Sequence, residues 1–378
     1  MLFYTTFSNP HKIAKLSFLT MKKPDTFLQI GILGCGPIAQ FAHLEACRKA
    51  ERIKLYAVCD QSEQLARKMG RFYDALKIFT EYEEMLADPA LDAVIIATSD
   101  AFHLSAAMQA LQADKHVLVE KPLGTDLSQA FALREELKHR GLHLQVGHMK
   151  RFDPGIAYAR EFVETGLGEM VAYKGWYADS THRYDMTDST QPIPYTSTKA
   201  RKPAVDPKAD LKRYFMLAHG CHLLDTARFL AGPIRGVHAR YTIKDNMHSW
   251  FVDTVFENGA NGHLDLTVAV RMDWHEGFQI YGTRGSTLGN IFNPWYFKTS
   301  EVRCFSEDTG EFRQILDNKA HFFKNQLEAF AGSILDGSKN PGADISDGIA
   351  SLQAMQAIHL SVERGEPVEP NSIREGML

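Results

Sequence analysis

The first half of the chain alternates short, densely apolar runs with segments of helical periodicity. The apolar runs are LQIGILG, IKLYAVCD, LDAVIIAT, HVLVEKP and LHLQVGHM, and helical patterns follow two of them, at residues 103–114 and 126–141. Apolar runs of this kind are typical of parallel strands that are covered on both faces. Strands and helices in alternation predict a doubly wound, Rossmann-type parallel sheet over residues 27–150.

The second half has a different pattern. A helical segment at residues 151–169 is followed by a strand pattern at 170–178 and then by a long polar segment, 178–214, that contains four prolines. From residue 234 to 300, apolar and polar positions alternate in several strand-length runs, as expected for an antiparallel sheet with one covered face. We therefore predict an α/β protein whose second domain, residues 151–378, has a large, mostly antiparallel, open-faced sheet.

Residues 1–26 are expected to be a disordered tail or a misassigned start, because Met21 lies just ahead of the first strand.

Composition excludes several classes of protein. The net charge of −4 gives no basic footprint for nucleic acid. No apolar run approaches the roughly 18 residues that a membrane span needs. The five cysteines are odd in number and form no CxxC pair, which favours a reducing, cytoplasmic location over a disulfide framework.

A glycine-rich turn follows the first strand. It is expected to bind a dinucleotide through the residues of the turn and the start of the next helix: Gly34, Cys35, Gly36, Pro37, Ile38 and Ala39. In this pattern Gly34 permits the tight turn, Gly36 lets the backbone approach a pyrophosphate, and Ala39 allows close packing of helix on strand.

An acidic residue ends the second strand. Asp60 lies 24 residues after Gly36, close to the spacing of about 20 that is typical of a ribose-binding acid. Its carboxylate would accept hydrogen bonds from the adenosine ribose and repel a 2′-phosphate. The sequence therefore predicts NAD as the cofactor in preference to NADP.

Two histidines begin a helical pattern later in the chain. His219 and His222 are three residues apart and so are expected to share one helix face. They could act as an enzyme's proton acceptor, cap the helix, or bind a metal. A metal would need a third ligand, and no zinc spacing such as HExxH is present, so no metal is expected.

Several motifs resemble the Gfo/Idh/MocA oxidoreductase family, and the resemblance extends from about residue 27 to 368. They are GILGCGPIA, ATSDAFH, HVLVEKPLG, GLHLQVGHMKRFDP, HGCHLLDTARFLAG, IYGTRGS and GIASLQAMQAIHLSVERGEPV. The resemblance implies a Rossmann domain, a C-terminal α/β domain, and oxidation or reduction of a secondary hydroxyl on a sugar, cyclitol or related polyol. It also implies a homodimer or homotetramer formed through the C-terminal sheet.

The resemblance assigns roles to particular residues. Lys121 would be the catalytic lysine, aimed by a cis bond to Pro122. Glu120 would orient it and approach the nicotinamide ribose, so both residues are also expected to bind the cofactor. Thr98 and His103 would line the cofactor cleft.

The histidine segment departs from the family pattern. The family has Asp-x-Gly-x-His-x-x-Asp, whereas Ala218 here replaces the first acid. His222 is then the expected proton acceptor, and His219 would replace the missing carboxylate. Substrate contacts are expected from Arg151, Arg183, Tyr184, Asp225 and Trp274.

We therefore expect hydride transfer between a polyol and NAD. Two alternatives remain open at this point. One is an NAD-dependent glycosidase or lyase that uses transient oxidation, and the other is a non-catalytic dinucleotide-binding regulator.

Overall fold

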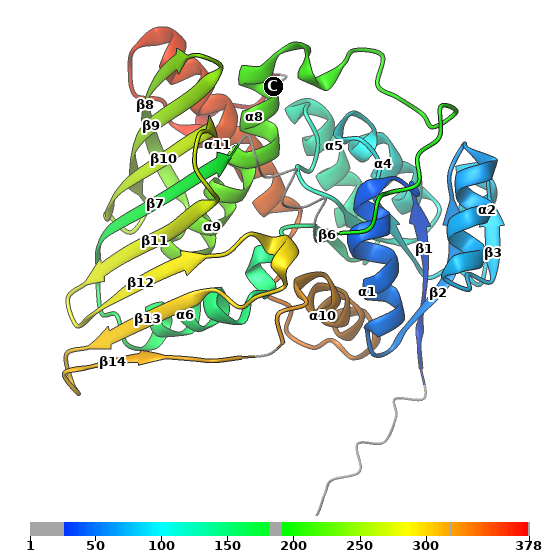
Figure 1. The fold of residues 1–378 in the computed structure, drawn as a ribbon, viewed down its shortest axis with the longest axis horizontal. Coiled ribbons are helices and arrows are strands. Elements are labelled where there is room, and N and C mark those ends of the chain that lie inside the picture. Colours follow the sequence, from blue (N-terminus) through cyan, green and yellow to red (C-terminus); the bar gives the residue numbers. More distant parts are fainter. Residues whose placement is uncertain (1–25, 181–190, 318, 377–378) are drawn as a thin grey trace, which may run out of the picture.

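The computed structural model of the chain describes residues 26–180, 191–317 and 319–376. Two sheets stand on opposite sides of the molecule, with several helices between them (Figure 1). The parallel sheet belongs to the first half of the chain and the larger sheet to the second half. The predicted fold class is confirmed.

The N-terminal sheet is parallel and doubly wound. Its six strands have the order β3-β2-β1-β4-β5-β6, so strands are added outward on one side of β1 and then, from β4 on, on its other side. The strands are β1 (Leu28–Leu33), β2 (Ile53–Cys59), β3 (Lys77–Phe79), β4 (Ala93–Ile96), β5 (His116–Val119) and β6 (Leu144–Val146). The helices of this half are α1 (Leu44–Lys49), α2 (Glu63–Phe72), α3 (Tyr82–Leu86), α4 (His103–Gln112) and α5 (Leu127–Lys138).

The C-terminal sheet has eight strands in the order β14-β13-β12-β11-β7-β10-β9-β8. All neighbours are antiparallel except β7 and β10, which run parallel. The strands are β7 (Met170–Ser180), β8 (Ile234–Lys244), β9 (Met247–Phe256), β10 (Asn261–Val270), β11 (His275–Gly282), β12 (Gly285–Ile291), β13 (Glu301–Ser306) and β14 (Glu311–Gln314).

Helices cover one face of this sheet and leave the other bare (Figure 1). The helices of this half are α6 (Pro154–Thr165), α8 (Leu211–Phe215), α9 (Cys221–Ala231), α10 (Phe322–Asp336) and α11 (Ile345–Arg364). The strands alternate accordingly: Tyr173 and Tyr177 of β7 are buried under the helices, whereas Lys174 between them is exposed.

Local sequence sets where many helices begin. Ser62, Asp126 and Asp153 each accept a hydrogen bond from a backbone N–H in the first turn of the following helix. Such caps satisfy donors that have no partner within the helix. Pro154 follows its cap at the first helical position, where no N–H is needed.

Helix α10 comes late in the sequence yet packs in the core of the Rossmann half. Its buried Phe323, Leu327 and Phe330 belong to the same apolar cluster as Ile30 and Ile32 of β1. The end of the chain therefore contributes to the fold of its beginning. Across the described residues, no helix is long and apolar enough to cross a membrane.

Candidate active site

The glycine turn after β1 has the shape that a dinucleotide requires. Gly34 has a φ of +93°, and a Cβ added there would lie 2.7 Å from the carbonyl oxygen of Ala97. A Cβ added at Gly36 would meet nothing within 4 Å, because this residue faces the open cleft. The open space above Gly36 therefore fits a pyrophosphate held against the backbone.

Asp60 at the end of β2 stabilises this turn. One carboxylate oxygen accepts the backbone N–H of Cys35 at 2.9 Å, and the other accepts that of Ser62 at 2.8 Å. Asp60 remains partly exposed and lines a cleft of about 650 Å³. Most of the predicted cofactor residues share this wall, namely Gly34, Gly36, Pro37, Ile38, Asp60 and Thr98.

Three predicted cofactor residues lie behind the wall of the cleft. The side chains of Cys35 and Ala39 are fully buried and pack in the apolar core. His103 is also buried, and its ring nitrogens lie 2.8 Å from the carbonyl oxygen of Pro122 and 3.1 Å from that of Thr98. His103 therefore joins two loops of the site, and its contact with a cofactor stays a prediction.

Glu120 and Lys121 follow β5, and the bond from Lys121 to Pro122 is cis. One Glu120 oxygen lies 2.8 Å from Nε2 of His43, and the other accepts the backbone N–H of Lys121 at 3.1 Å. Burial acts to raise the pKa of Glu120, but the hydrogen bond with His43 and the nearby charges hold the pKa below its usual value. Glu120 is thus a buried carboxylate that fixes the backbone of the lysine.

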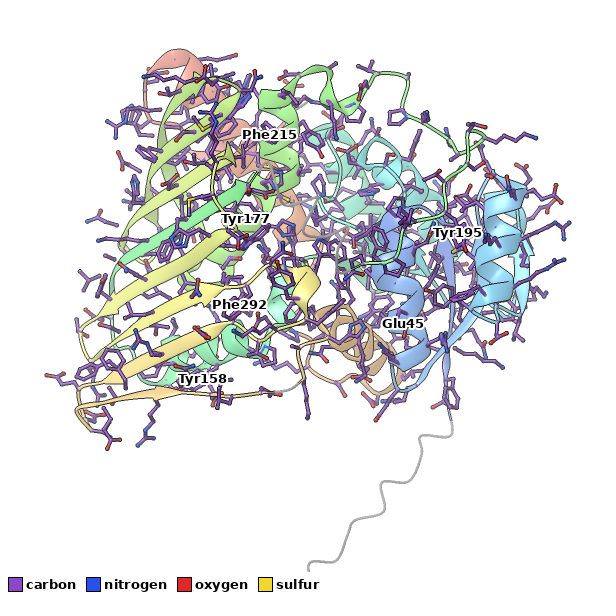
Figure 2. All side chains as sticks on the ribbon, viewed as in Figure 1. Glu45, Tyr158, Tyr177, Tyr195, Phe215 and Phe292 are labelled. Carbon is purple, nitrogen blue, oxygen red and sulfur yellow. The ribbon has the colours of Figure 1, made fainter. Side chains whose placement is uncertain are left out.

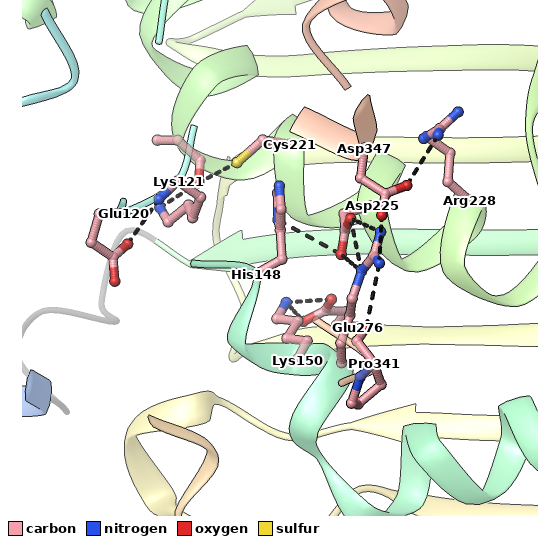
Figure 3. A network of polar contacts seen from close by, with 12 residues as sticks. Glu120, Lys121, His148, Lys150, Cys221, Asp225, Arg228, Glu276, Pro341 and Asp347 are labelled. Atoms are coloured by element: carbon pink, nitrogen blue, oxygen red, sulfur yellow. Dashed lines mark hydrogen bonds and ion pairs between the residues drawn. The ribbon is translucent and has the colours of Figure 1, made fainter. Parts of the chain in front are cut away.

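The ammonium of Lys121 reaches the other half of the molecule. It lies 3.4 Å from the carbonyl oxygen of Ala218, in the π-helical turn η5 (Met216–Gly220) that precedes α9 (Figure 3). This turn carries His219, and His222 follows in the first turn of α9. The lysine and both histidines are therefore brought to one place.

Tyr177 of β7 lies against both histidines. The centroid of its ring is 5.5 Å from that of His219 and 6.4 Å from that of His222, and the second pair is stacked. The two histidines thus share one face, as predicted. Nδ1 of His219 lies 3.2 Å from the hydroxyl of Tyr177 and 3.3 Å from a carboxylate oxygen of Asp179. Asp179 supplies a carboxylate beside the histidines although position 218 is alanine.

The surroundings of His222 keep its imidazole neutral. Burial, followed by the charges of Lys121 and Lys150, holds the pKa of His222 well below 6.5. A neutral imidazole can accept a proton at pH 7. His222 therefore has the protonation state that a general base needs.

A second lysine also lies against Tyr177. Lys150 is buried and forms an ion pair with Glu276, whose oxygens are 2.5 and 2.6 Å from Nζ. Its ammonium is 4.7 Å from the ring centroid of Tyr177 and 5.4 Å from that of Trp274. The rings of Trp274 and Tyr177 pack edge to face, which places Trp274 beside the histidines.

Arg151 and Asp225 pair with each other. Arg151 donates to both oxygens of Asp225, from Nε at 3.0 Å and from Nη2 at 2.7 Å, and also to Asp347 at 2.8 Å. Both members are buried, and His148 lies between this ion pair and Lys121 (Figure 3). The two side chains neutralise each other's charge, as a buried charge requires; their contact with substrate stays a prediction.

Two predicted substrate residues, Arg183 and Tyr184, lie outside the described residues. Within the described part of the chain, no group of three His, Cys, Asp or Glu side chains is arranged to hold a metal ion.

Comparison with known proteins shows the family to which the chain belongs. The family profile described as "Oxidoreductase family, NAD-binding Rossmann fold" matches residues 28–148, and the "GFO/IDH/MocA C-terminal domain" profile matches residues 157–288. The chain belongs to the Gfo/Idh/MocA oxidoreductase family. Its first half is an NAD-binding Rossmann domain.

Two relatives are cyclitol dehydrogenases. The chain is 33% identical to scyllo-inositol 2-dehydrogenase (NAD(+)) of Bacillus subtilis over 362 residues, which cover 90% of this chain and 96% of that protein. It is 32% identical to myo-inositol 2-dehydrogenase of Thermotoga maritima, covering 90% and 98%. A solved structure of levoglucosan dehydrogenase with NADH has a similar fold, with a TM-score of 0.75, 20% identity, and coverage of 91% and 99%.

Some residues of the site were not predicted from the sequence. His43 contacts the predicted Glu120, and Asp179 contacts the predicted His219. Lys150 lies over the ring of the predicted Trp274, and Glu276 pairs with Lys150. Lys150 precedes Arg151 within one of the family motifs, so the sequence did contain a signal that could have identified this residue. The others are brought into the site only by tertiary packing.

Proposed function

We propose that this oxidoreductase transfers a hydride between NAD and a secondary hydroxyl of a cyclitol or a related polyol. The observation that carries the proposal is the 3.4 Å contact of the Lys121 ammonium with the carbonyl oxygen of Ala218. This contact joins the cofactor-binding half to the turn that holds His219 and His222. The imidazole of His222, as proton acceptor, and the ammonium of Lys121, as fixed positive charge, therefore belong to one site.

The roles follow from the charges. Neutral His222 accepts the hydroxyl proton of the substrate, and the ammonium of Lys121 stabilises negative charge on the same oxygen as the carbonyl forms. The nicotinamide of bound NAD accepts the hydride from the adjacent carbon. His219, held by Tyr177 and Asp179, is placed to hydrogen-bond a neighbouring hydroxyl or to orient His222.

The aromatic side of the site favours a ring-shaped polyol. Trp274 is only partly buried and offers a flat apolar surface, against which the C–H face of such a ring can pack while its hydroxyls face the polar groups. The indole N–H of Trp274 has no hydrogen-bond partner among the residues that the structure describes, which leaves it able to donate to a hydroxyl. The relatives named as inositol dehydrogenases support the same substrate class. Arg183 and Tyr184 are proposed as further substrate contacts on sequence grounds alone.

A panel of inositols, aldoses and glycosides tests this function. The expected result is net formation of NADH, followed at 340 nm, with at least one inositol or related polyol and NAD. Release of aglycone from a glycoside without net NADH would instead indicate a glycosidase or lyase that recycles its cofactor. Absence of both reactions, with NAD still bound, would indicate a regulator.

We also propose that two copies associate through the bare face of the C-terminal sheet. Phe251 is 44% exposed and Tyr281 is 37% exposed on this face. Sedimentation of the wild type and of a Phe251→Asp variant tests the assembly, and a monomeric wild type would contradict it.

We further propose that the protein acts in a reducing, cytoplasmic location. Its five cysteines are buried and unpaired, which supports this location.

A further inference from the structure

A segment of the C-terminal half lies on the Rossmann half, far from the strands and helices that precede and follow it. It comprises residues 191–201 and runs across the cofactor domain towards α2 (Figure 1). The side-chain amide of Gln40 accepts the backbone N–H of Tyr195 and donates to its carbonyl oxygen, both at 2.9 Å. This reciprocal pair fixes the segment at the edge of the glycine turn.

Two further contacts hold the same segment. The ammonium of Lys68 in α2 is 3.2 Å from the ring centroid of Tyr195, and the hydroxyl of buried Ser62 donates to that of Ser197 at 2.7 Å. Tyr195 accordingly lies beside α1 and α2 rather than beside the C-terminal sheet (Figure 2). Ser62 also donates its backbone N–H to Asp60, so the segment is joined to the ribose-binding acid through a single residue.

The segment then enters the cofactor cleft. Ala200 and Arg201 line the cleft together with Asp60 and Phe102. The guanidinium carbon of Arg201 is 4.1 Å from the ring centroid of Phe102, which keeps the side chain at the cleft wall. Residues from both halves of the chain therefore line the cleft.

The position of Arg201 within the cleft indicates which part of NAD it would contact. The pyrophosphate belongs at Gly34 and Gly36, and the adenosine ribose belongs at Asp60. Phe102 follows β4, on the opposite wall from Asp60 and the end of β2. The space between these walls beyond the ribose is that of the adenine ring.

We infer that Arg201 is a cofactor-binding residue that covers the adenine of NAD, held there by the contacts of Tyr195 and Ser197. The planar guanidinium stacks on aromatic faces, whereas the ammonium of a lysine does not present a plane. Arg201 stacks on Phe102 with one face of its guanidinium and would present the opposite face to the adenine. The inference does not rest on the proposed reaction, because it concerns binding of the cofactor alone.

Direct binding by isothermal titration calorimetry tests this with NAD and with ADP-ribose, which lacks the nicotinamide. In Arg201→Ala we expect the Kd for both molecules to rise about tenfold, the loss typical of one stacking contact on a base. Arg201→Lys should lose a similar amount, since it keeps the charge and loses the plane. Lys202→Ala is the matched control, because Lys202 is exposed and is not among the residues that line the cleft, and its Kd should be unchanged.

Two results would overturn the inference. An unchanged Kd in Arg201→Ala would show that the residue does not cover the adenine, and full affinity in Arg201→Lys would assign it a purely electrostatic role. The same titrations in a Lys121→Ala background separate this inference from the proposed reaction. There, the effect of Arg201→Ala on binding should persist although turnover is lost.

Discussion

The lysine loop and the histidine turn meet in one site but are held in different ways. Lys121 is positioned by its own half of the molecule: Glu120 accepts its backbone N–H, and His103 contacts the carbonyl oxygen of Pro122. His219 is positioned by Tyr177 and Asp179, about forty residues earlier in the chain and on a strand of the large sheet.

This difference separates the half that holds the cofactor and the fixed positive charge from the half that handles the proton. The lysine loop is part of a rigid parallel sheet whose geometry is shared by dinucleotide-binding domains generally. The histidine turn depends on side chains of the C-terminal sheet, namely Tyr177 and Asp179. Substitutions in the first half should therefore change cofactor binding or the charge at the reacting oxygen, and those in the second half should change proton transfer.

The strongest test of this division is Lys121→Ala. We expect kcat to fall about a hundredfold or more, because a fixed positive charge at the developing oxyanion is lost. The Kd for NAD should remain close to that of the wild type, since the glycine turn and Asp60 are unchanged. Steady-state kinetics and calorimetry measure the two quantities, with Lys54→Ala, an exposed lysine of β2, as the control. If the variant lost its affinity for NAD as strongly as its turnover, the lysine loop would be a binding element and the comparison would fail.

The second test concerns the histidine turn. Because burial and neighbouring cations hold the pKa of His222 well below 6.5, the acidic limb of the pH profile of kcat/KM should lie below pH 6.5. His222→Asn should lower kcat about a hundredfold and remove that limb, since the base is absent.

His219→Asn provides the matched comparison. The positive form of His219 is one of the charges that lower the pKa of His222. Removing it should therefore move the acidic limb to higher pH, with a smaller loss of kcat than in His222→Asn. A limb that stays in place in both variants would show that neither histidine accepts the proton.

The lysine loop and the histidine turn also show how much of the molecule could be predicted from its sequence. The sheet of the Rossmann half and the glycine turn were predictable because each depends on a short stretch of chain with fixed spacing, whereas the role proposed for Lys121 came from the family resemblance. The shared face of the two histidines followed from helical periodicity and is confirmed by their common contact with Tyr177.

Contacts between distant segments could not be predicted in this way. Asp179 lies at the border of a polar segment and had no motif to mark it. The ion pair that buried Arg151 and Asp225 form with each other was likewise not predicted from the sequence. The short strand β3 and the packing of α10 on β1 likewise depend on the tertiary fold.

The two glycines of the turn offer a sharper test within the Rossmann half. Gly34→Ala should destabilise the protein by about 1–3 kcal/mol, because alanine is strained at this φ and its Cβ would press on the carbonyl of Ala97. Gly36→Ala should leave the melting temperature unchanged, since its Cβ meets no protein atom, yet raise the Kd for NAD about tenfold by occupying the pyrophosphate space. Thermal unfolding and calorimetry distinguish the two. Equal loss of stability in both variants would mean that Gly36 has a structural role and that the open space above it is not the pyrophosphate site.

The smallest effect is expected at Asp60, where binding and structure share one side chain. Asp60→Asn retains an oxygen that can accept one of the two backbone hydrogen bonds, from Cys35 or Ser62, and loses the negative charge. The Kd for NAD should rise only about fivefold, the order of one net hydrogen bond. The Kd for NADP should fall at the same time, because the repulsion between a carboxylate and the 2′-phosphate is removed. Titration of both cofactors against the wild type and the variant measures the change in preference. If NAD and NADP bound the wild type equally well, Asp60 would serve only to hold the turn, and cofactor choice would have to come from other residues of the cleft.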